Sequence, residues 1–138
     1  MSKAPRSFLF ALRCTLLLLM AHVGGGCGSD DHSEIFGPPT QTKCPEISTL
    51  SYGTFGQQFM ESYCTRCHSS QLKGAARNGA PDYHDFDTVA GIRSVADHID
   101  QTAAAGPATT NTAMPPGGAM PTEQERRQLG EWISCGAP

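Results

Sequence analysis

The pentapeptide Cys64-Thr65-Arg66-Cys67-His68 decides how the rest of this 138-residue chain is interpreted. Two thiols separated by two residues can each add to a vinyl group of one porphyrin, and the histidine that follows is then held beneath the iron as a ligand. Redox dithiols and half zinc sites share the Cys-x-x-Cys spacing, but the adjacent histidine favours haem attachment. The sequence therefore predicts one haem c per chain, bound covalently through Cys64 and Cys67, with His68 on the iron.

The N-terminus has the pattern of an export signal. Three basic residues precede an apolar stretch at 16–23, and Gly24-Gly25-Gly26-Cys27 follows. The stretch is too short and wrongly flanked for a stable membrane span. It resembles a bacterial lipoprotein signal, in which the cysteine, here Cys27, carries the lipid and becomes the first residue. Gly24 departs from that pattern, which usually has an apolar residue there, so plain cleavage nearby is the alternative.

Removal of residues 1–26 leaves an acidic chain. Seven Lys and Arg then face 13 Asp and Glu, for a net charge of −6. This balance argues against nucleic acid or an anionic membrane surface as a partner, and it suits a redox partner protein with a basic patch. Residues 28–43 have few apolar side chains and several turn formers, so residues 27–43 are predicted to be a flexible tether to a domain at 44–138.

Two cysteines remain unassigned after Cys27 is assigned to the lipid and Cys64 and Cys67 to the haem. Cys44 and Cys135 form an even remainder in an exported chain, which favours a disulfide; two free thiols are the alternative. Such a bridge would join the start of the domain to its end and contribute about 2–4 kcal/mol.

Apolar periodicity predicts a first helix from near Thr54 into the pentapeptide. Phe55, Phe59 and Tyr63 recur at four-residue spacing, and Ser51 or Thr54 is expected to cap the helix. The apolar face would then lie near the porphyrin.

Two further helices are predicted downstream. Asp87 is expected to cap a helix that runs through Asp100, and Thr122 and Glu125 form a capping box for the last helix. The apolar stripe of the last helix is Leu129, Trp132 and Ile133. Trp132 is expected to dominate its packing against the first helix.

The loops between these helices hold the remaining candidate residues. Pro81, in the irregular segment 69–86, is a candidate to offer a backbone carbonyl to the ring of His68. Met114-Pro115-Pro116-Gly117-Gly118-Ala119-Met120-Pro121 is a stiff segment that can hold a thioether at a fixed distance from a metal. Met114 and Met120 are both candidate sixth ligands. His84 and His98 are expected to be exposed polar residues.

At this point the chain resembles the single-domain, class I c-type cytochromes, in particular exported bacterial lipoprotein forms. The resemblance covers residues 44–138 and rests on the pentapeptide, Gly79-Ala80-Pro81, Met114-Pro115-Pro116 and the closing Leu129…Trp132-Ile133…Cys135-Gly136. It implies an all-α small cytochrome c fold with about three main helices, the first and last crossing beside the haem. It further implies that Met114 is the distal ligand, with Met120 as the alternative, and that Pro81 orients the histidine.

The expected function is one-electron transfer. Methionine and histidine together fill both axial positions of the iron, which leaves no open site for a substrate. We therefore expect a mono-haem electron carrier rather than an enzyme, acting alone or as a subunit of an oxidoreductase, on the periplasmic side of a bacterial membrane, the outer membrane included. The alternative is a haem enzyme, peroxidase or gas sensor with an open sixth position. A zinc site lacks a fourth ligand, and a redox-thiol module lacks a strand–helix context.

Overall fold

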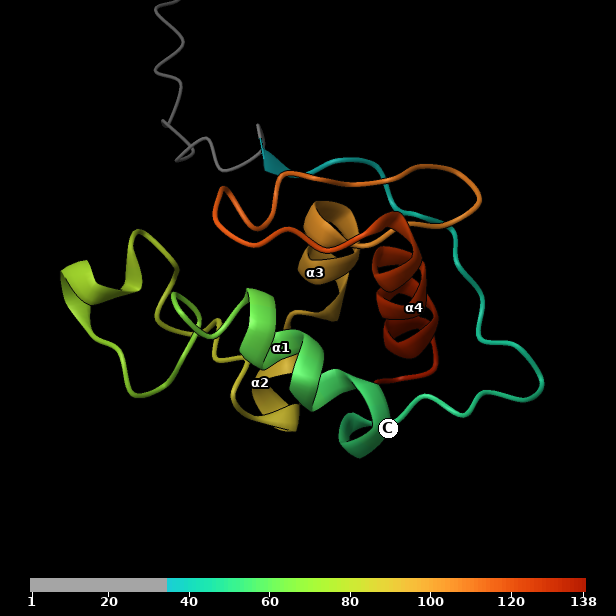
Figure 1. Ribbon diagram of the computed structural model, residues 1–138, viewed down its shortest axis with the longest axis horizontal. Coiled ribbons are helices and arrows are strands. Elements are labelled where there is room, and N and C mark those ends of the chain that lie inside the picture. The colour runs from blue at the N-terminus through green and yellow to red at the C-terminus, as the bar shows by residue number, and fades with distance from the viewer. Residues whose placement is uncertain (1–34) are drawn as a thin grey trace, which may run out of the picture.

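The computed structural model describes residues 35–138 and is built from short helices (Figure 1). The α-helices are α1 (Gln57–Tyr63), α2 (Val89–Ser94), α3 (Ala96–Ala103) and α4 (Glu123–Ser134). A π-helical turn at Tyr52–Gly56 and a 3-10 turn at Gly74–Arg77 complete the elements. Within residues 35–138 the only β-type pairing is an isolated bridge between Ala105 and Thr110. The predicted all-α fold is confirmed.

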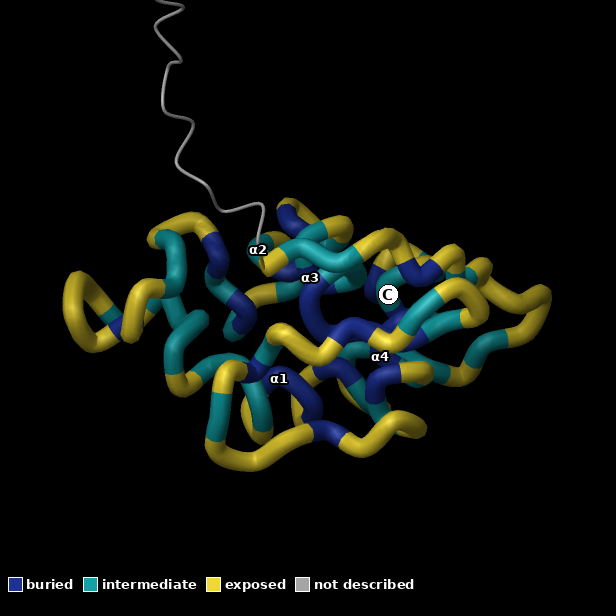
Figure 2. The backbone as a smooth tube through the Cα atoms, turned by 90° about the horizontal axis from the view of Figure 1, so that it is seen from above, coloured by how far each residue is buried: buried dark blue, intermediate teal, exposed yellow. Residues whose placement is uncertain are grey.

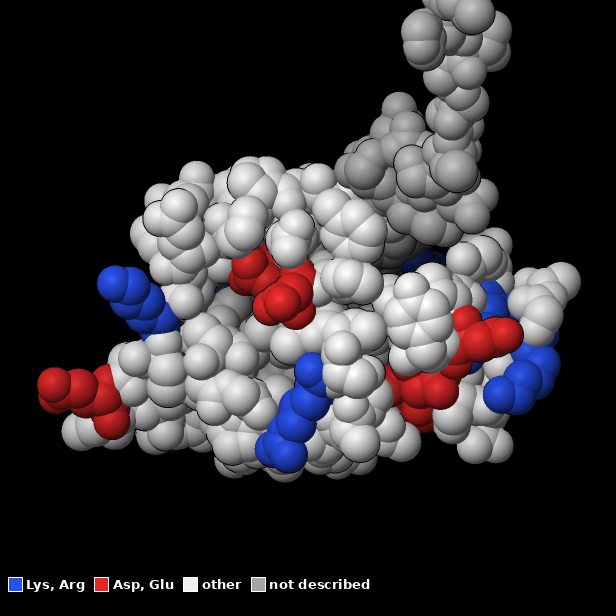
Figure 3. Space-filling view, turned by 180° about the vertical axis from the view of Figure 1, so that it is seen from behind, with Lys and Arg blue, Asp and Glu red and all other residues white. Residues whose placement is uncertain are grey.

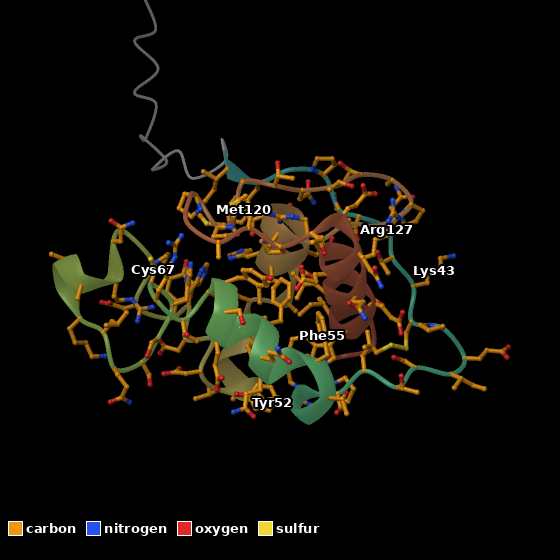
Figure 4. The ribbon with its side chains drawn as sticks, in the orientation of Figure 1. Lys43, Tyr52, Phe55, Cys67, Met120 and Arg127 are labelled. Atoms are coloured by element: carbon orange, nitrogen blue, oxygen red, sulfur yellow. A yellow bond between two sulfur atoms is a disulfide. The ribbon has the colours of Figure 1, made fainter. Side chains whose placement is uncertain are left out.

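The crossing of the first and last helical segments forms the centre of the core. Trp132 of α4 is fully buried, and its ring lies 6.0 Å from that of Phe55 in an edge-on arrangement. Gly56 permits this approach, because a Cβ atom there would lie 2.4 Å from the Trp132 ring. Figure 4 shows Phe55 between α1 and α4. The prediction that Trp132 packs against the first helix is confirmed.

The first helical segment begins at a serine cap. The Ser51 hydroxyl accepts the backbone N–H of Thr54, and the Thr54 hydroxyl accepts the backbone N–H of Ser51 at 2.9 Å. This reciprocal pair is a capping box that satisfies two otherwise unpaired backbone donors. A π-helical turn follows directly, and α-helical geometry begins only at Gln57. Of the two predicted caps, Ser51 is therefore the one used.

The predicted capping box of α4 is confirmed. The Thr122 hydroxyl accepts the backbone N–H of Glu125, whose carboxylate accepts the backbone N–H of Thr122 at 2.7 Å. The Tyr63 hydroxyl donates to the same carboxylate at 2.9 Å, which ties the end of α1 to the start of α4. The backbone hydrogen bond from Thr122, then those from the Thr122 and Tyr63 side chains, hold the pKa of Glu125 below its usual value.

The single helix predicted between Asp87 and Asp100 is wrong. The chain forms two helices, α2 and α3, because Val95 adopts φ −132° and ψ 31°, which interrupts the helical ladder. The cap of α2 is Thr88, whose side chain accepts a backbone N–H of the first turn. The break lets the apolar faces of both short helices reach the core, where Ile92, Val95 and Ile99 are buried.

Asp87 has a different role from the predicted cap. Its carboxylate oxygen Oδ2 accepts from the Ser69 hydroxyl at 2.8 Å and from the backbone N–H of Ser70 at 3.0 Å. Asp87 therefore pins the segment just after the pentapeptide to the start of α2. The other carboxylate oxygen, Oδ1, is buried and has no hydrogen-bond partner among the described residues, so it does not cap the helix.

Residues 36–42 pack on α3, so the expectation of a flexible tether over 27–43 does not hold for them. Thr40 is fully buried, and its backbone N–H and hydroxyl donate to the Asp100 carboxylate at 2.8 and 2.5 Å. The backbone N–H of Gly37 donates to the carbonyl of Gln101 at 2.8 Å. A few polar contacts thus anchor a segment that has little apolar surface of its own. The predicted signal at 1–26 and the lipidation site Cys27 lie outside the described residues.

The two ends of the described domain are joined. A disulfide links Cys44 to Cys135 across 91 residues, with an S–S distance of 1.99 Å. The backbone N–H of Tyr52 donates to the carbonyl of the last residue, Pro138, at 2.5 Å. Figure 1 shows the C-terminus beside the start of the first helical segment, and Figure 2 shows the buried backbone concentrated where the helices meet.

Candidate functional site

A mostly apolar cavity of about 280 Å³ lies between α1, the segment 64–86, α3, the segment 114–121 and α4. Its apolar wall includes Phe59, Tyr63, Phe86, Ile99, Ala103 and Leu129. The same cavity is lined by Cys64, Cys67, His68, Met114 and Pro81. Residues as far apart in the sequence as Phe59 and Leu129 are therefore collected around one space.

The pentapeptide leaves α1 in a tight turn. The backbone N–H groups of Cys67 and His68 both donate to the carbonyl of Cys64, at 3.1 and 3.0 Å, and this turn brings all three side chains to the cavity. Both cysteines are free thiols. Burial raises the pKa of the Cys64 thiol to about 12, opposed by the charges of Arg126 and Arg66. A redox dithiol needs a low thiol pKa, so this environment disfavours that alternative.

The His68 ring is held by aromatic stacking. It lies 4.5 Å from the ring of Phe86 at an interplanar angle of 11°, and 5.7 Å from the ring of His84. The backbone N–H of Phe86 donates to the His68 carbonyl at 2.8 Å. Burial lowers the pKa of His68, and the nearby Arg77 guanidinium acts in the same direction. A neutral imidazole at physiological pH is the form that binds a metal.

The Nδ1 atom of His68 is buried and has no hydrogen-bond partner among the described residues. The backbone of His84 acts to raise the pKa of His68, against the effect of burial. No hydrogen bond of normal geometry joins the His84 backbone to Nδ1 of His68. The carbonyl of Pro81, the predicted partner of His68, instead accepts from Arg77 at 2.5 Å and from the backbone N–H of His84 at 3.0 Å. Sequence reasoning did not single out Arg77, because loop arginines are usually exposed.

Met114 is fixed by its backbone on both sides. Its N–H donates to the carbonyl of Thr102 at 2.9 Å, and its carbonyl accepts from Arg126 Nη1 at 2.9 Å. Arg126, almost fully buried, also donates to the carbonyls of Ala103 and Asn111. These bonds anchor the start of the segment 114–121 to α3 and α4.

The two candidate methionines have different surroundings. Met114 is partly buried against the core and lines the cavity. Met120 does not line it, and 47% of its surface is exposed. Figure 4 shows Met120 on the outer loop and Cys67 at the junction of the loop region with the helices. Of the two, only Met114 shares the cavity with His68.

Two histidines expected to be exposed are part of the cavity wall instead, so that expectation was wrong. His84 is buried and His98 half-buried, and Nδ1 of His98 lies 3.2 Å from Nε2 of His84. Burial, followed by the charge of His68, lowers the pKa of His84 to about 4. Phe36 covers His98 at a ring distance of 4.7 Å. Sequence pattern held no signal for this, because His84 lies in a loop without periodicity.

Comparison with known protein families gives one match. Residues 54–133, more than half of the chain, match the family described as cytochrome C oxidase, cbb3-type, subunit III. The chain belongs to this family. It is therefore a haem-binding electron-transfer cytochrome of the c type. The chain matches no curated protein and no solved structure.

The cavity of this cbb3-type cytochrome domain fits a haem. Its volume of about 280 Å³ lies just below the range of about 300–1,000 Å³ seen for pockets that bind small organic molecules. The wall is apolar, as a porphyrin face requires, and it carries two free thiols, a neutral imidazole and a thioether. The buried Nδ1 of His68 has no hydrogen-bond partner among the described residues, and the ring stacks on Phe86.

No helix among the described residues of this cytochrome is long and apolar enough to cross a membrane. Within residues 35–138 there is also no group of three or more His, Cys, Asp or Glu side chains suited to a separate metal ion.

Proposed function

We propose that this protein is a mono-haem c-type cytochrome that carries one electron at a time between redox partner proteins outside the cytoplasm. The observation that carries the proposal is the meeting of Cys64, Cys67, His68 and Met114 on one apolar cavity. The sequence contains one Cys-x-x-Cys-His pentapeptide, which supports one haem per chain.

The role of each residue follows from its chemistry. Cys64 and Cys67 would hold the haem through thioether bonds, so that it is not lost outside the cell. His68 and Met114 would be the two axial ligands, and Pro81 lies in the loop beside His68. The haem supplies an iron that alternates between ferric and ferrous states. A methionine opposite a histidine favours the ferrous state and leaves no open position, which supports electron transfer over catalysis.

Export and membrane attachment belong to the proposal as well. The signal pattern at 1–26 supports export, and Cys27 is the proposed site of an N-terminal lipid that holds the domain at the periplasmic side of a membrane. A Cys27→Ala variant is expected to leave the membrane fraction and appear in the soluble periplasmic fraction. Retention of that variant in the membrane would contradict a lipid anchor at this residue.

Redox partners are proposed to be proteins rather than nucleic acid. The face shown in Figure 3 carries scattered Lys and Arg side chains and small groups of Asp and Glu, with wide uncharged areas between them. Nucleic acids require a concentrated basic surface. The face in Figure 3 shows no such concentration of basic side chains.

The test is a visible spectrum of the full chain produced with haem-maturation machinery, oxidised and reduced, for the wild type, Met114→Ala and Met120→Ala. We expect a low-spin ferric spectrum with a methionine–iron charge-transfer band that only Met114→Ala removes. Met120→Ala is the matched control, because it deletes a similar side chain outside the cavity. A high-spin ferrous wild type that binds carbon monoxide readily would contradict the proposal and support a haem enzyme or gas sensor.

A further inference from the structure

A buried arginine lies in the loop that follows the haem pentapeptide. Arg77 ends the 3-10 turn Gly74–Arg77, and only 1% of its side chain is exposed. Asn78, in the left-handed conformation at φ 50°, turns the chain back after it. The loop thereby wraps around the guanidinium. A charged side chain is seldom buried to this extent unless its donors are satisfied.

The loop satisfies this guanidinium mainly with neutral groups. Nε donates to the carbonyl of Ala80 at 3.1 Å, Nη1 to the carbonyl of Ser69 at 2.7 Å and the carboxylate of Asp85 at 2.9 Å, and Nη2 to the carbonyls of Pro81 at 2.5 Å and His84 at 2.9 Å. Four of these five acceptors are backbone carbonyls. The positive charge of Arg77 is therefore balanced mainly by one carboxylate, that of Asp85, whose side chain is 27% exposed.

A second carboxylate is close but differs in its surroundings. Asp82 lies 3.6 Å from Nε of Arg77, and its side chain is 86% exposed. Water and salt screen an exposed carboxylate far more strongly than a buried one. Asp82 and Asp85 thus provide two acidic neighbours of one buried cation, of which only Asp85 is placed to offset the charge.

Arg77 is also linked to the surroundings of His68 through hydrogen bonds to backbone carbonyls. It binds the carbonyl of Ser69, the residue directly after His68, and the carbonyl of His84, whose ring stacks on His68 at 5.7 Å. Pro81 and His84 both line the cavity with His68. The buried cation therefore lies directly behind this part of the cavity wall, bonded to the carbonyls of two wall residues, and its charge acts on His68.

We propose that Arg77 is a positioning residue that raises the reduction potential of the iron bound to His68. Its buried charge disfavours the ferric state, and its hydrogen bonds withdraw electron density from the Pro81 and His84 carbonyls beside the histidine. The inference rests on the proposed function, in which His68 is an axial ligand. Arg77 keeps its proton throughout, and the single electron is exchanged with a redox partner protein.

The expected effect is large enough to measure. Removal of a buried charge at this position is expected to shift the ferric–ferrous equilibrium by roughly tenfold, which corresponds to about 59 mV for a one-electron couple. Because the charge is buried, added salt should reduce this shift only slightly.

The experiment is a potentiometric titration of the haem-loaded full chain for the wild type, Arg77→Met, Asp85→Asn and Asp82→Asn. We expect Arg77→Met to lower the potential and Asp85→Asn to raise it, because the second variant uncovers the arginine charge. Asp82→Asn is the matched control and is expected to leave the potential unchanged. Arg77→Lys keeps the charge without the five-donor fork and is expected to restore most of the lost potential.

Opposite shifts from the two variants distinguish an electrostatic role from a structural one, since damage to the loop would not produce opposite signs. If Arg77→Met and Asp85→Asn both retain the wild-type potential in a low-spin, haem-loaded protein, this inference is wrong while the proposed function stands. A wild type that attaches no haem at Cys64 and Cys67 overturns both. If Arg77→Met does not yield loaded protein, Asp85→Asn decides: a raised potential supports the inference, and an unchanged or lowered one overturns it.

Discussion

Replacement of Gly56 by alanine tests the helix crossing that forms one end of the haem cavity. A Cβ atom at Gly56 would lie 2.4, 2.5 and 2.9 Å from three atoms of the Trp132 ring, whereas ordinary contact begins at 3.4 Å. Trp132 is fully buried and cannot swing into solvent. The two segments must therefore move apart by about 1 Å, since cores are close-packed and yield little.

The magnitude follows from two opposing effects. Overpacking of a well-packed core costs about 1–3 kcal/mol and sometimes more, and the overlap here involves three ring atoms. Alanine recovers about 0.5–1 kcal/mol of backbone entropy within a helical turn. We expect a net destabilisation of about 2 kcal/mol, which corresponds to a fall in melting temperature of about 8 °C for a domain of this size.

Denaturant and thermal unfolding of the haem-loaded protein, followed by circular dichroism, measure this change. Gly53→Ala is the matched control, because no atom lies within 4 Å of a Cβ at that position in the same helical turn. Gly53→Ala is expected to leave stability unchanged or slightly raised. Equal stability of Gly56→Ala and Gly53→Ala would refute the close approach of Trp132 to the first helical segment.

Three further predictions concern the disulfide, the cap of α4 and the contact between Thr40 and Asp100. The double variant Cys44→Ser, Cys135→Ser is expected to lose about 2–4 kcal/mol of unfolding free energy, because the bridge closes a loop of 91 residues; reducing agent should destabilise the wild type but not the variant. Hydrogen bonds from the N-cap residue of α4 lower the pKa of Glu125 in the folded protein. The ionised carboxylate therefore stabilises the fold at pH values above its unfolded pKa of about 4.3, and this stabilisation is lost as the pH falls through the folded pKa. Glu125→Gln should therefore flatten the acid side of the stability profile, and an unchanged profile would contradict this linkage. Thr40→Val is expected to cost about 1–3 kcal/mol by leaving the Asp100 carboxylate underbonded, and to speed hydrogen exchange at residues 37–42; wild-type exchange rates there would show that this contact is dispensable.

Local sequence patterns predicted the helices that carry the site. The four-residue spacing of Phe55, Phe59 and Tyr63 and the Thr122–Glu125 capping box both correspond to helices in the structure. Caps and apolar stripes depend on residues three or four positions apart, so they are visible in one dimension. The same reasoning failed at Val95, where the backbone leaves helical geometry between α2 and α3 and apolar side chains of both helices are buried in one core.

The surroundings of His68 were the least predictable part of the site. His84 and Arg77 lie in a loop that has no apolar periodicity, yet both are buried. The burial of Arg77 depends on carbonyl groups that the loop itself arranges, and the His84 ring packs beside the stacked pair of Phe86 and His68. Neither residue type signals burial by itself, because histidine and arginine are more often at the surface.

The sequence by itself determined the chemistry of this cytochrome: a Cys-x-x-Cys-His pentapeptide, a Met-Pro-Pro segment and apolar stripes that predict helices. These features are short-range, so no tertiary information is needed to find them. Only the tertiary structure decided that Met114 and not Met120 lines the cavity, that Thr40 belongs to the domain, and that a buried Arg77 neighbours His68. Each of these depends on which distant segments meet, and that is decided by how the short helices bury their apolar faces together.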